Sequence, residues 1–216
     1  MKHIGRCLFL VSLLSFCIPF AAAQTAEFGI GFGTNHVKSS ATGIDSNTLG
    51  TCTPATDIFC QTTPGLNGFF LGFGGDVMLS KYLGVGGEIS FLPSKGNYGP
   101  LLFRETFYDF NGVFEPFHAS KRVVPRFMGG IGGAKSGFSV NESQCVGTAV
   151  CSNSTLSVGS SNHFQLHVGA GVDILLTEHL FIRPQFDFRY VPNFTDQFGS
   201  NLVYGGMFWL GFKSSR

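Results

Sequence analysis

Charged residues are scarce in this sequence, and long apolar runs are absent after its first 23 residues. Asp, Glu, Lys and Arg make up 12% of the chain, against roughly 25% in an ordinary soluble protein. No window beyond residue 23 holds ~18 uninterrupted apolar residues, which excludes a membrane-spanning helix there. The formal net charge of +1 lacks the basic excess of a nucleic-acid-binding protein, so no nucleic-acid partner is expected.

Tryptophan is also rare, with a single residue, whereas phenylalanine and glycine are abundant, with 25 and 30 residues. Aromatic residues reach 14% of the chain. Little charge, many Phe and Gly residues and no membrane helix are together typical of a β-barrel that crosses a membrane with strands.

The first 23 residues have the pattern of an export signal. A basic region at 2–6 precedes a mostly apolar run at 7–19, and three alanines at 21–23 supply a small-residue cleavage site. We expect a signal peptide at 1–23 and one outer-membrane β-barrel domain at 24–216. An uncleaved anchor is the alternative, but the apolar run is shorter than the ~20 residues that a span needs.

Four cysteines follow this signal, in two local pairs: Cys52 with Cys60, and Cys145 with Cys151. Four cysteines allow three connectivities, and closeness in sequence favours these two pairs. An oxidising compartment favours disulfides over a four-thiolate zinc site, and neither pair has Cys-x-x-Cys spacing. We therefore expect two disulfides and no metal.

Apolar and polar residues alternate strictly over residues 180–190. One parity holds Ile182, Pro184, Phe186, Phe188 and Tyr190, and the other holds Arg183, Gln185, Asp187 and Arg189. Strand side chains alternate between two faces, so this segment predicts a strand with one apolar and one charged face. A soluble sandwich strand would alternate in the same way. Here, however, the polar parity carries both signs of charge beside many glycines, which favours a polar barrel interior and an apolar face toward lipid.

The pattern recurs about eight times and predicts an all-β fold, an eight-stranded antiparallel up-and-down transmembrane β-barrel. Strands are expected at about 26–36, 66–80, 83–91, 102–113, 122–137, 164–174, 180–190 and 202–213. Long or medium connections follow every odd strand and tight turns follow every even one, as in a barrel with short periplasmic turns and long outer loops. Both parities of the last strand are apolar, so its facing stays open. Pro125 and Pro184 cannot donate ladder hydrogen bonds, so we expect them near the periplasmic rim or at bulges.

The polar parity predicts an inward-facing charge network of eight residues: Glu88, Asp109, Arg126, His167, Asp173, Arg183, Asp187 and Arg189. Buried charges must pair, and eight strands leave room for side chains or one small ligand. The first interpretation is a salt-bridged plug that fills the lumen. The alternative is a narrow ion path lined by Arg126, Arg183 and Arg189.

Catalytic motifs are missing. There is no Gly-x-Ser-x-Gly nucleophile elbow, and the glycine-rich stretches 29–33 and 129–133 precede no predicted helix, which argues against a dinucleotide site. We expect neither enzymatic activity nor a cofactor. Because some small barrels modify lipids, Ser/His chemistry near His163 or His167 remains the enzymatic alternative.

The signal, the eight alternating strands and the closing segment 204–212 (Tyr-Gly-Gly-Met-Phe-Trp-Leu-Gly-Phe) resemble the OmpA/OmpX-type outer-membrane β-barrel domain, a porin-like family of small barrels. The resemblance implies a Gram-negative outer membrane, contact with outer-membrane lipid and insertion by the barrel-assembly machinery. Family members commonly end on an aromatic residue, whereas here Phe212 is followed by four more residues. No peptidoglycan-binding domain follows, so a wall tether is not expected.

From these features we expect a monomer with a structural or surface-interaction role. The role would be carried by disulfide-clamped extracellular loops at 38–65 and 135–162, and the external ligand is not identified by the sequence. The alternatives are a narrow pore for ions or small solutes and a lipid-modifying outer-membrane enzyme.

Overall fold

The computed structural model describes residues 25–39, 65–98, 101–117, 122–146 and 150–214, with the backbone alone at 142–146, 150–153 and 196. The expected signal peptide and the Cys52–Cys60 pair lie outside the described residues. Within the described part, no helix is long and apolar enough to span a membrane.

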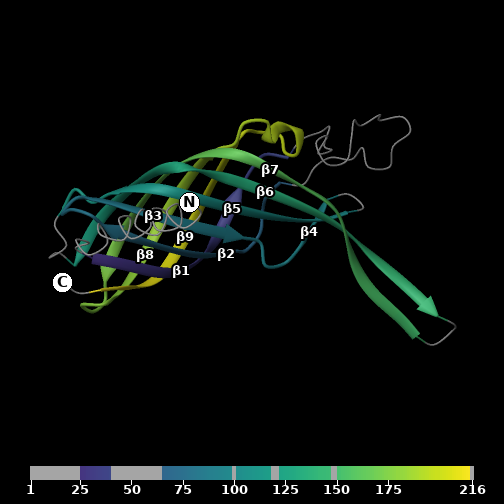
Figure 1. Ribbon diagram of the computed structural model, residues 1–216, viewed down its shortest axis with the longest axis horizontal. Coiled ribbons are helices and arrows are strands. Elements are labelled where there is room, and N and C mark those ends of the chain that lie inside the picture. The colour runs from purple at the N-terminus through teal and green to yellow at the C-terminus, as the bar shows by residue number, and fades with distance from the viewer. Residues whose placement is uncertain (1–24, 40–64, 99–100, 118–121, 147–149, 215–216) are drawn as a thin grey trace, which may run out of the picture.

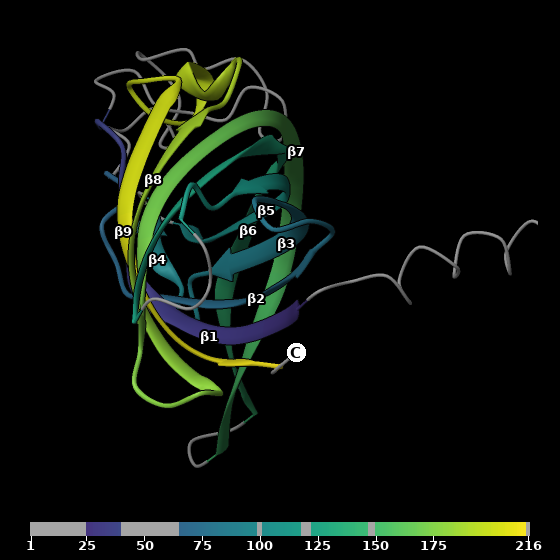
Figure 2. The ribbon, with the colours of Figure 1, turned by 90° about the vertical axis from the view of Figure 1, so that its left-hand side faces the viewer.

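Eight antiparallel strands form a closed barrel, which Figure 1 shows from the side and Figure 2 from one end. They are β1 (Thr25–His36), β2 (Phe70–Met78), β3 (Leu83–Phe91), β5 (Leu101–Phe114), β6 (Val123–Val146), β7 (Val150–Leu175), β8 (Leu180–Tyr190) and β9 (Leu202–Lys213). β1 pairs with β9, and β5 pairs back onto β3, so the ring has no open edge. A short strand β4 (Gly96–Tyr98) adds to β5, and a 3-10 helix η2 (Phe194–Asp196) lies between β8 and β9. The predicted fold class is confirmed.

Alternation along each strand sets which side chains face lipid and which face the lumen. In β8, Phe186 is 52% exposed while Asp187 is fully buried. The same alternation assigns β9, where Trp209 is buried and Leu210 is 51% exposed. Trp209 therefore points inward, which settles the facing that the sequence left open. In lipid the closed ladder matters, because every backbone N–H and C=O must find its partner inside the protein.

The two rims of the barrel differ in the length of the connections between strands. The short-turn rim carries the start of β1, the end of β9 and the connections 79–82, 115–122 and 176–179. At this rim, the Ala26 amide donates to Ser214 Oγ at 2.9 Å and ties the ends of the barrel together. The opposite, long-loop rim carries the links 37–69, 92–100 and 191–201 and the β6–β7 connection.

The prediction of a loop at 135–162 is wrong for most of that range, which is strand in the structure. β6 and β7 continue past the barrel and pair with each other as far as Val146 and Val150, forming a projecting hairpin (Figure 1). β5 leaves β6 at Ser139, next to a register shift between Phe138 and Ser139. A two-stranded ribbon outside the membrane has water on both faces, so its sequence needs no apolar parity and resembles a polar loop.

The two prolines lie where the ladder tolerates them. Pro125 is the third residue of β6, next to the short-turn rim. Pro184 is the fifth residue of β8, and on its β7 side paired positions are missing between Gly171↔Gln185 and Ile174↔Ile182. A proline without an N–H fits such an interruption.

Candidate functional site: the filled lumen

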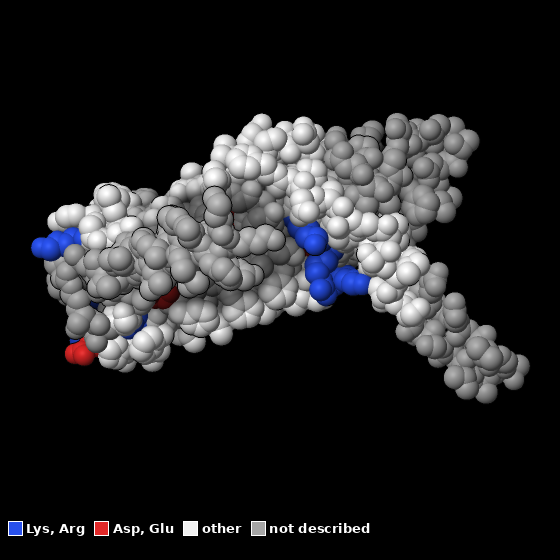
Figure 3. Space-filling view, in the orientation of Figure 1, with Lys and Arg blue, Asp and Glu red and all other residues white. Residues whose placement is uncertain are grey.

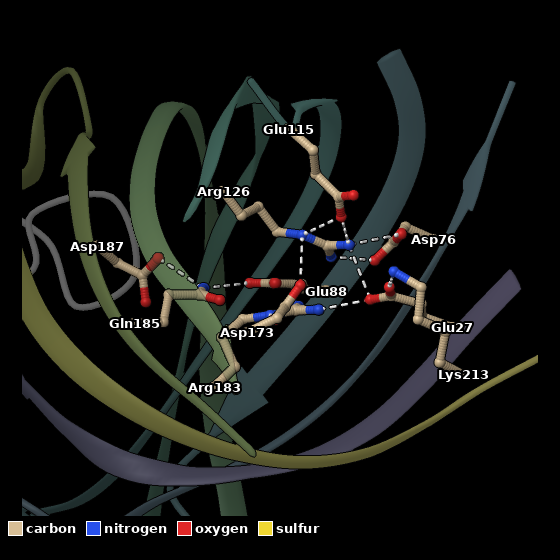
Figure 4. Close-up of polar contacts among 10 residues, drawn as sticks. All are labelled: Glu27, Asp76, Glu88, Glu115, Arg126, Asp173, Arg183, Gln185, Asp187 and Lys213. Atoms are coloured by element: carbon tan, nitrogen blue, oxygen red, sulfur yellow. Dashed lines mark hydrogen bonds and ion pairs between the residues drawn. The ribbon is translucent and has the colours of Figure 1, made fainter. Parts of the chain in front are cut away.

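Arg126 is the hub of the lumen at its short-turn end (Figure 4). Its guanidinium is fully buried and lies 2.8 Å from Glu27 Oε2, 2.6 Å from Asp76 Oδ2, 2.5 Å from Glu115 Oε1 and 3.3 Å from Asp173 Oδ2. These carboxylates come from β1, β2, the β5–β6 connection and β7. The five N–H donors of a planar guanidinium suit several carboxylates at once. One side chain thereby ties four separate parts of the barrel together.

Glu27 forms ion pairs with two further cationic side chains. Arg183 Nη2 donates to its Oε2 at 2.6 Å, and Lys213 Nζ lies 2.6 Å from its Oε1. Arg183 also pairs with Asp173 through its Nε. Arg183 on β8 and Lys213 on β9 add two more positions around the ring, so the ion pairs extend across the lumen between strands.

A second polar group lies nearer the middle of the barrel and is centred on His167. Its Nδ1 is 2.9 Å from Asn111 Oδ1 and its Nε2 is 2.9 Å from Asp187 Oδ1. The Gln185 amide then donates to Asp187 at 2.9 Å and to Glu88 at 3.0 Å. Both ring nitrogens of His167 are engaged, which makes it a bridge between strands.

Arg189 forms the remaining part of this second group. Its Nε and Nη2 each lie 3.4 Å from Asp109 Oδ2, and its Nη1 donates to Asn35 Oδ1 at 3.2 Å. Its guanidinium carbon also lies 5.2 Å from the centre of the Phe107 ring. Phe107 marks the point where the lumen turns apolar.

All eight residues of the expected charge network face the lumen, seven of them buried and Glu88 half-buried. The structure divides them between the Arg126 group and the His167–Arg189 group. Four charged partners were not in the expected set: Glu27, Asp76, Glu115 and Lys213. Strand parity could have found Glu27, Asp76 and Lys213, because each is next to an outward apolar residue. Glu115 follows the end of β5, where parity gives no signal.

Three acids of the Arg126 group come close enough to suggest a metal site. Carboxylate oxygens of Glu27, Glu115 and Asp173 lie within 4.8 Å of one another. The Arg126 guanidinium contacts all three, however. The position that a cation would take is therefore held by a fixed positive side chain.

An apolar cluster, the plug, occupies the lumen toward the long-loop rim. It is built from inward residues of several strands and from the η2 region, and it includes Val37, Leu66, Phe70, Leu92, Tyr98, Leu101, Phe103, Phe107, Phe138, Val191, Phe194, Phe198, Val203, Met207 and Trp209. The Phe194 and Phe198 rings lie 4.7 Å apart, and Phe198 meets Phe103 at 6.1 Å. The expectation that inward means polar fails here, as the inward Phe103 and Phe107 of β5 show.

Gln197 fastens η2 to the barrel wall under this plug. Its Oε1 accepts from Ser136 Oγ at 2.8 Å, and its Nε2 lies 2.5 Å from Ser161 Oγ and 2.7 Å from His163 Nε2. Tyr98 Oη donates to the Gln197 backbone carbonyl at 3.2 Å. These bonds hold the segment that carries Phe194 and Phe198 across the mouth of the barrel.

Comparison with known proteins shows similarity in sequence pattern and fold. The sequence model of the family described as "Outer membrane protein beta-barrel domain" matches residues 8–213. No curated protein matches the chain.

Among solved structures, the outer membrane protein OprG from Pseudomonas aeruginosa aligns with a TM-score of 0.51 and 14% identity, covering 90% of this chain and 98% of that one. Neisserial surface protein A aligns at 0.48 and 13% identity, covering 88% and 97%. The N-terminal β-barrel domain of Pseudomonas aeruginosa OprF aligns at 0.47 and 10% identity, covering 89% and 98%. At these identities the likeness concerns the fold.

Proposed function

Because the chain belongs to the outer membrane protein beta-barrel domain family, we propose that it is a closed, non-conducting barrel of the bacterial outer membrane with a structural or surface-interaction role. The segments at the long-loop rim carry that role. The supporting observation is a lumen filled at two levels, by ion pairs around Arg126 and by the apolar plug. A barrel closed at both levels can present surfaces but offers no passage.

The filled lumen favours a plug over the alternative of a narrow pore. An ion path would need cations facing open space, yet Arg126, Arg183 and Arg189 each contact carboxylates from other strands. Eight strands also leave little room beyond the side chains themselves. Planar-bilayer recordings with purified folded protein should show no conductance, and a stable single-channel current would establish the pore instead.

The β6–β7 hairpin is the most prominent candidate for an interaction surface, since it extends beyond the barrel (Figure 1). Its backbone register sets Cys145 directly opposite Cys151. Opposed residues of antiparallel strands have Cα atoms roughly 4.5–5.5 Å apart, which suits a disulfide. We propose that this pair clamps the hairpin, in line with an oxidising location.

A hydrolytic role has one supporting feature. Ser161 and His163 line the same pocket at the long-loop rim, with His163 Nε2 3.3 Å from Ser161 Oγ. The same ring nitrogen also lies beside the Gln197 amide, and His167 has both nitrogens engaged. We therefore place both histidines in structural roles. Altered lipid A in cells that overproduce the protein, lost on His163→Ala, would establish the enzymatic alternative.

Selective cleavage tests the proposed orientation. A site-specific protease sequence is inserted between Val146 and Val150 in one variant and between Ser80 and Lys81 in a matched control. The protease added to intact cells should cut only the hairpin variant, while both are cut in lysed cells. Cutting at the Ser80–Lys81 turn in intact cells would show that the barrel has the opposite orientation.

A further inference from the structure

Three basic side chains point outward from neighbouring strands where the barrel meets the hairpin. Lys95 immediately precedes β4, Arg104 lies in β5 and Lys135 lies in β6, and all three are exposed. The register pairs Gly96 with Phe103 and Thr106 with Lys135, so the three positions are close neighbours on one face of the sheet. Figure 3 shows basic side chains gathered at this junction.

None of the three forms an ion pair with another described residue. Lys95 Nζ donates to Ser139 Oγ at 2.9 Å, and Arg104 Nη2 donates to the Pro93 carbonyl at 3.3 Å. Inside the barrel, by contrast, Arg126 and Arg189 both pair with carboxylates. The outward positions beside the three cations are Leu102, Thr106 and Gly137, which include no acid. Their positive charge is therefore free to meet an external anion.

The three cations lie just beyond the lipid-facing apolar band. Along β6 the outward residues run from Val123 through Phe127 to Ile131, which are 50–56% exposed, and Lys135 follows. Along β5 the band ends at Tyr108, which is 42% exposed, and Arg104 comes two outward positions later. About ten residues of a tilted strand match the ~25 Å height of the apolar band of outer-membrane barrels. Lys135 and Arg104 thus fall at the level of lipid headgroups.

We propose that Lys95, Arg104 and Lys135 form a binding site on the outside of the barrel for the phosphate groups of the outer-leaflet glycolipid. A guanidinium binds phosphate through two parallel N–H donors, and a lysine adds a compact positive charge. A lipid is the occupant that the position favours, because its acyl chains would lie against Ile131 and Tyr108 while its phosphates meet the cations. A soluble anion would gain nothing from that apolar surface.

Binding to a phosphorylated glycolipid tests this site. Folded protein in neutral detergent micelles is titrated with bisphosphorylated lipid A and, separately, with lipid A stripped of both phosphates. The test variant is Lys95→Gln/Arg104→Gln/Lys135→Gln. The control is Lys81→Gln/Arg122→Gln, which removes two exposed cations from the short-turn rim. Heat-modifiable gel migration verifies that each variant is folded.

We expect the affinity for bisphosphorylated lipid A to fall about fivefold per cation removed, or about a hundredfold for the triple variant. The control should bind like the wild type, and dephosphorylated lipid A should bind all three proteins equally weakly. An unchanged triple variant, or an equal loss in the control, overturns the site. Displacement of lipid A by an equal concentration of inorganic phosphate would show a phosphate site without lipid specificity and overturn the lipid assignment. The result does not depend on barrel orientation, because micelles have no sides.

Discussion

Glu27 on β1 and Arg126 on β6 meet across the full width of the barrel. Their side chains are buried, with Nη2 and Oε2 2.8 Å apart. In the ring order, three strands separate β1 from β6 in either direction. The pair therefore spans the lumen between opposite walls. Such a contact fixes the cross-section of the barrel in a way that no pairing between neighbouring strands can.

Removing the hub should destabilise the barrel strongly. Arg126→Met leaves Glu27, Asp76, Glu115 and Asp173 buried without their shared cation. Breaking a buried ion pair by removing one partner costs about 3–5 kcal/mol. We expect a loss of that size in the free energy of unfolding, measured by urea titration in lipid vesicles.

The matched control is Arg122→Met, four residues earlier and exposed at the short-turn rim. It should change the free energy of unfolding by less than about 0.5 kcal/mol. If Arg126→Met and Arg122→Met are equally stable, the Arg126 group does not hold the barrel together.

Adjacent residues of β8 should differ in how much a new positive charge destabilises the barrel. Phe186 is 52% exposed on the lipid face, and Phe186→Arg should cost about 2–4 kcal/mol if it lies near the bilayer midplane. Gln185 faces the lumen and donates to both Glu88 and Asp187. Gln185→Arg would meet two acids there and should cost less. Urea unfolding in vesicles compares the two variants, and equal costs would contradict the assigned facing.

The sequence predicted the number and order of the barrel strands, and the facing of strands such as β8, because these follow from one repeated rule. A strand that separates lipid from a polar lumen must alternate with period two, and β8 displays this from Leu180 to Tyr190. The eight inward residues of the expected charge network followed from the same rule. Their grouping around Arg126 and around His167 did not, because it depends on which strands face each other across the ring.

Three features escaped prediction for distinct physical reasons. Both faces of the hairpin beyond Ser139 contact water, so its sequence lacks the alternation of apolar and polar residues that would predict strands. The apolar plug places Phe103 and Phe107 inside, where the rule expects polar residues. In β9 both parities are apolar, so the inward direction of Trp209 could only come from the closed structure, in which β9 pairs with β1 and β8.

A disulfide in the hairpin can be tested by counting reactive thiols. In Cys52→Ser/Cys60→Ser protein, Cys145 and Cys151 would be the cysteines left once the expected signal peptide is removed, and their backbones are opposed. We expect the denatured variant to take up a thiol reagent only after reduction, as measured by mass. Labelling without reductant would show free thiols. Reduction should leave the heat-modifiable migration of the barrel unchanged, since the pair lies in the part of β6 and β7 that projects beyond the closed barrel.

The single tryptophan makes the inside of the barrel accessible to fluorescence. Trp209 is 2% exposed and belongs to the plug with Phe194 and Phe198. Acrylamide in water and spin-labelled lipid in the membrane should both quench it poorly. Trp209→Phe/Leu210→Trp moves the ring one position along β9 to the lipid face, where spin-labelled lipid should quench it strongly. Strong lipid quenching of the wild type would contradict the inward direction of Trp209.

Quenching of Trp209 fluorescence also reports whether the plug shields the lumen from water. Phe194→Ala/Phe198→Ala removes two aromatic rings of the plug on the long-loop side of Trp209, so acrylamide should reach the indole and raise the quenching constant several-fold over the wild type. Phe212→Ala, on the lipid face of the same strand and 52% exposed, is the matched control and should leave quenching unchanged. The plug variant should still show no conductance in planar bilayers, because the ion pairs around Arg126 close the lumen independently. A current in that variant would mean that the apolar plug alone seals the barrel.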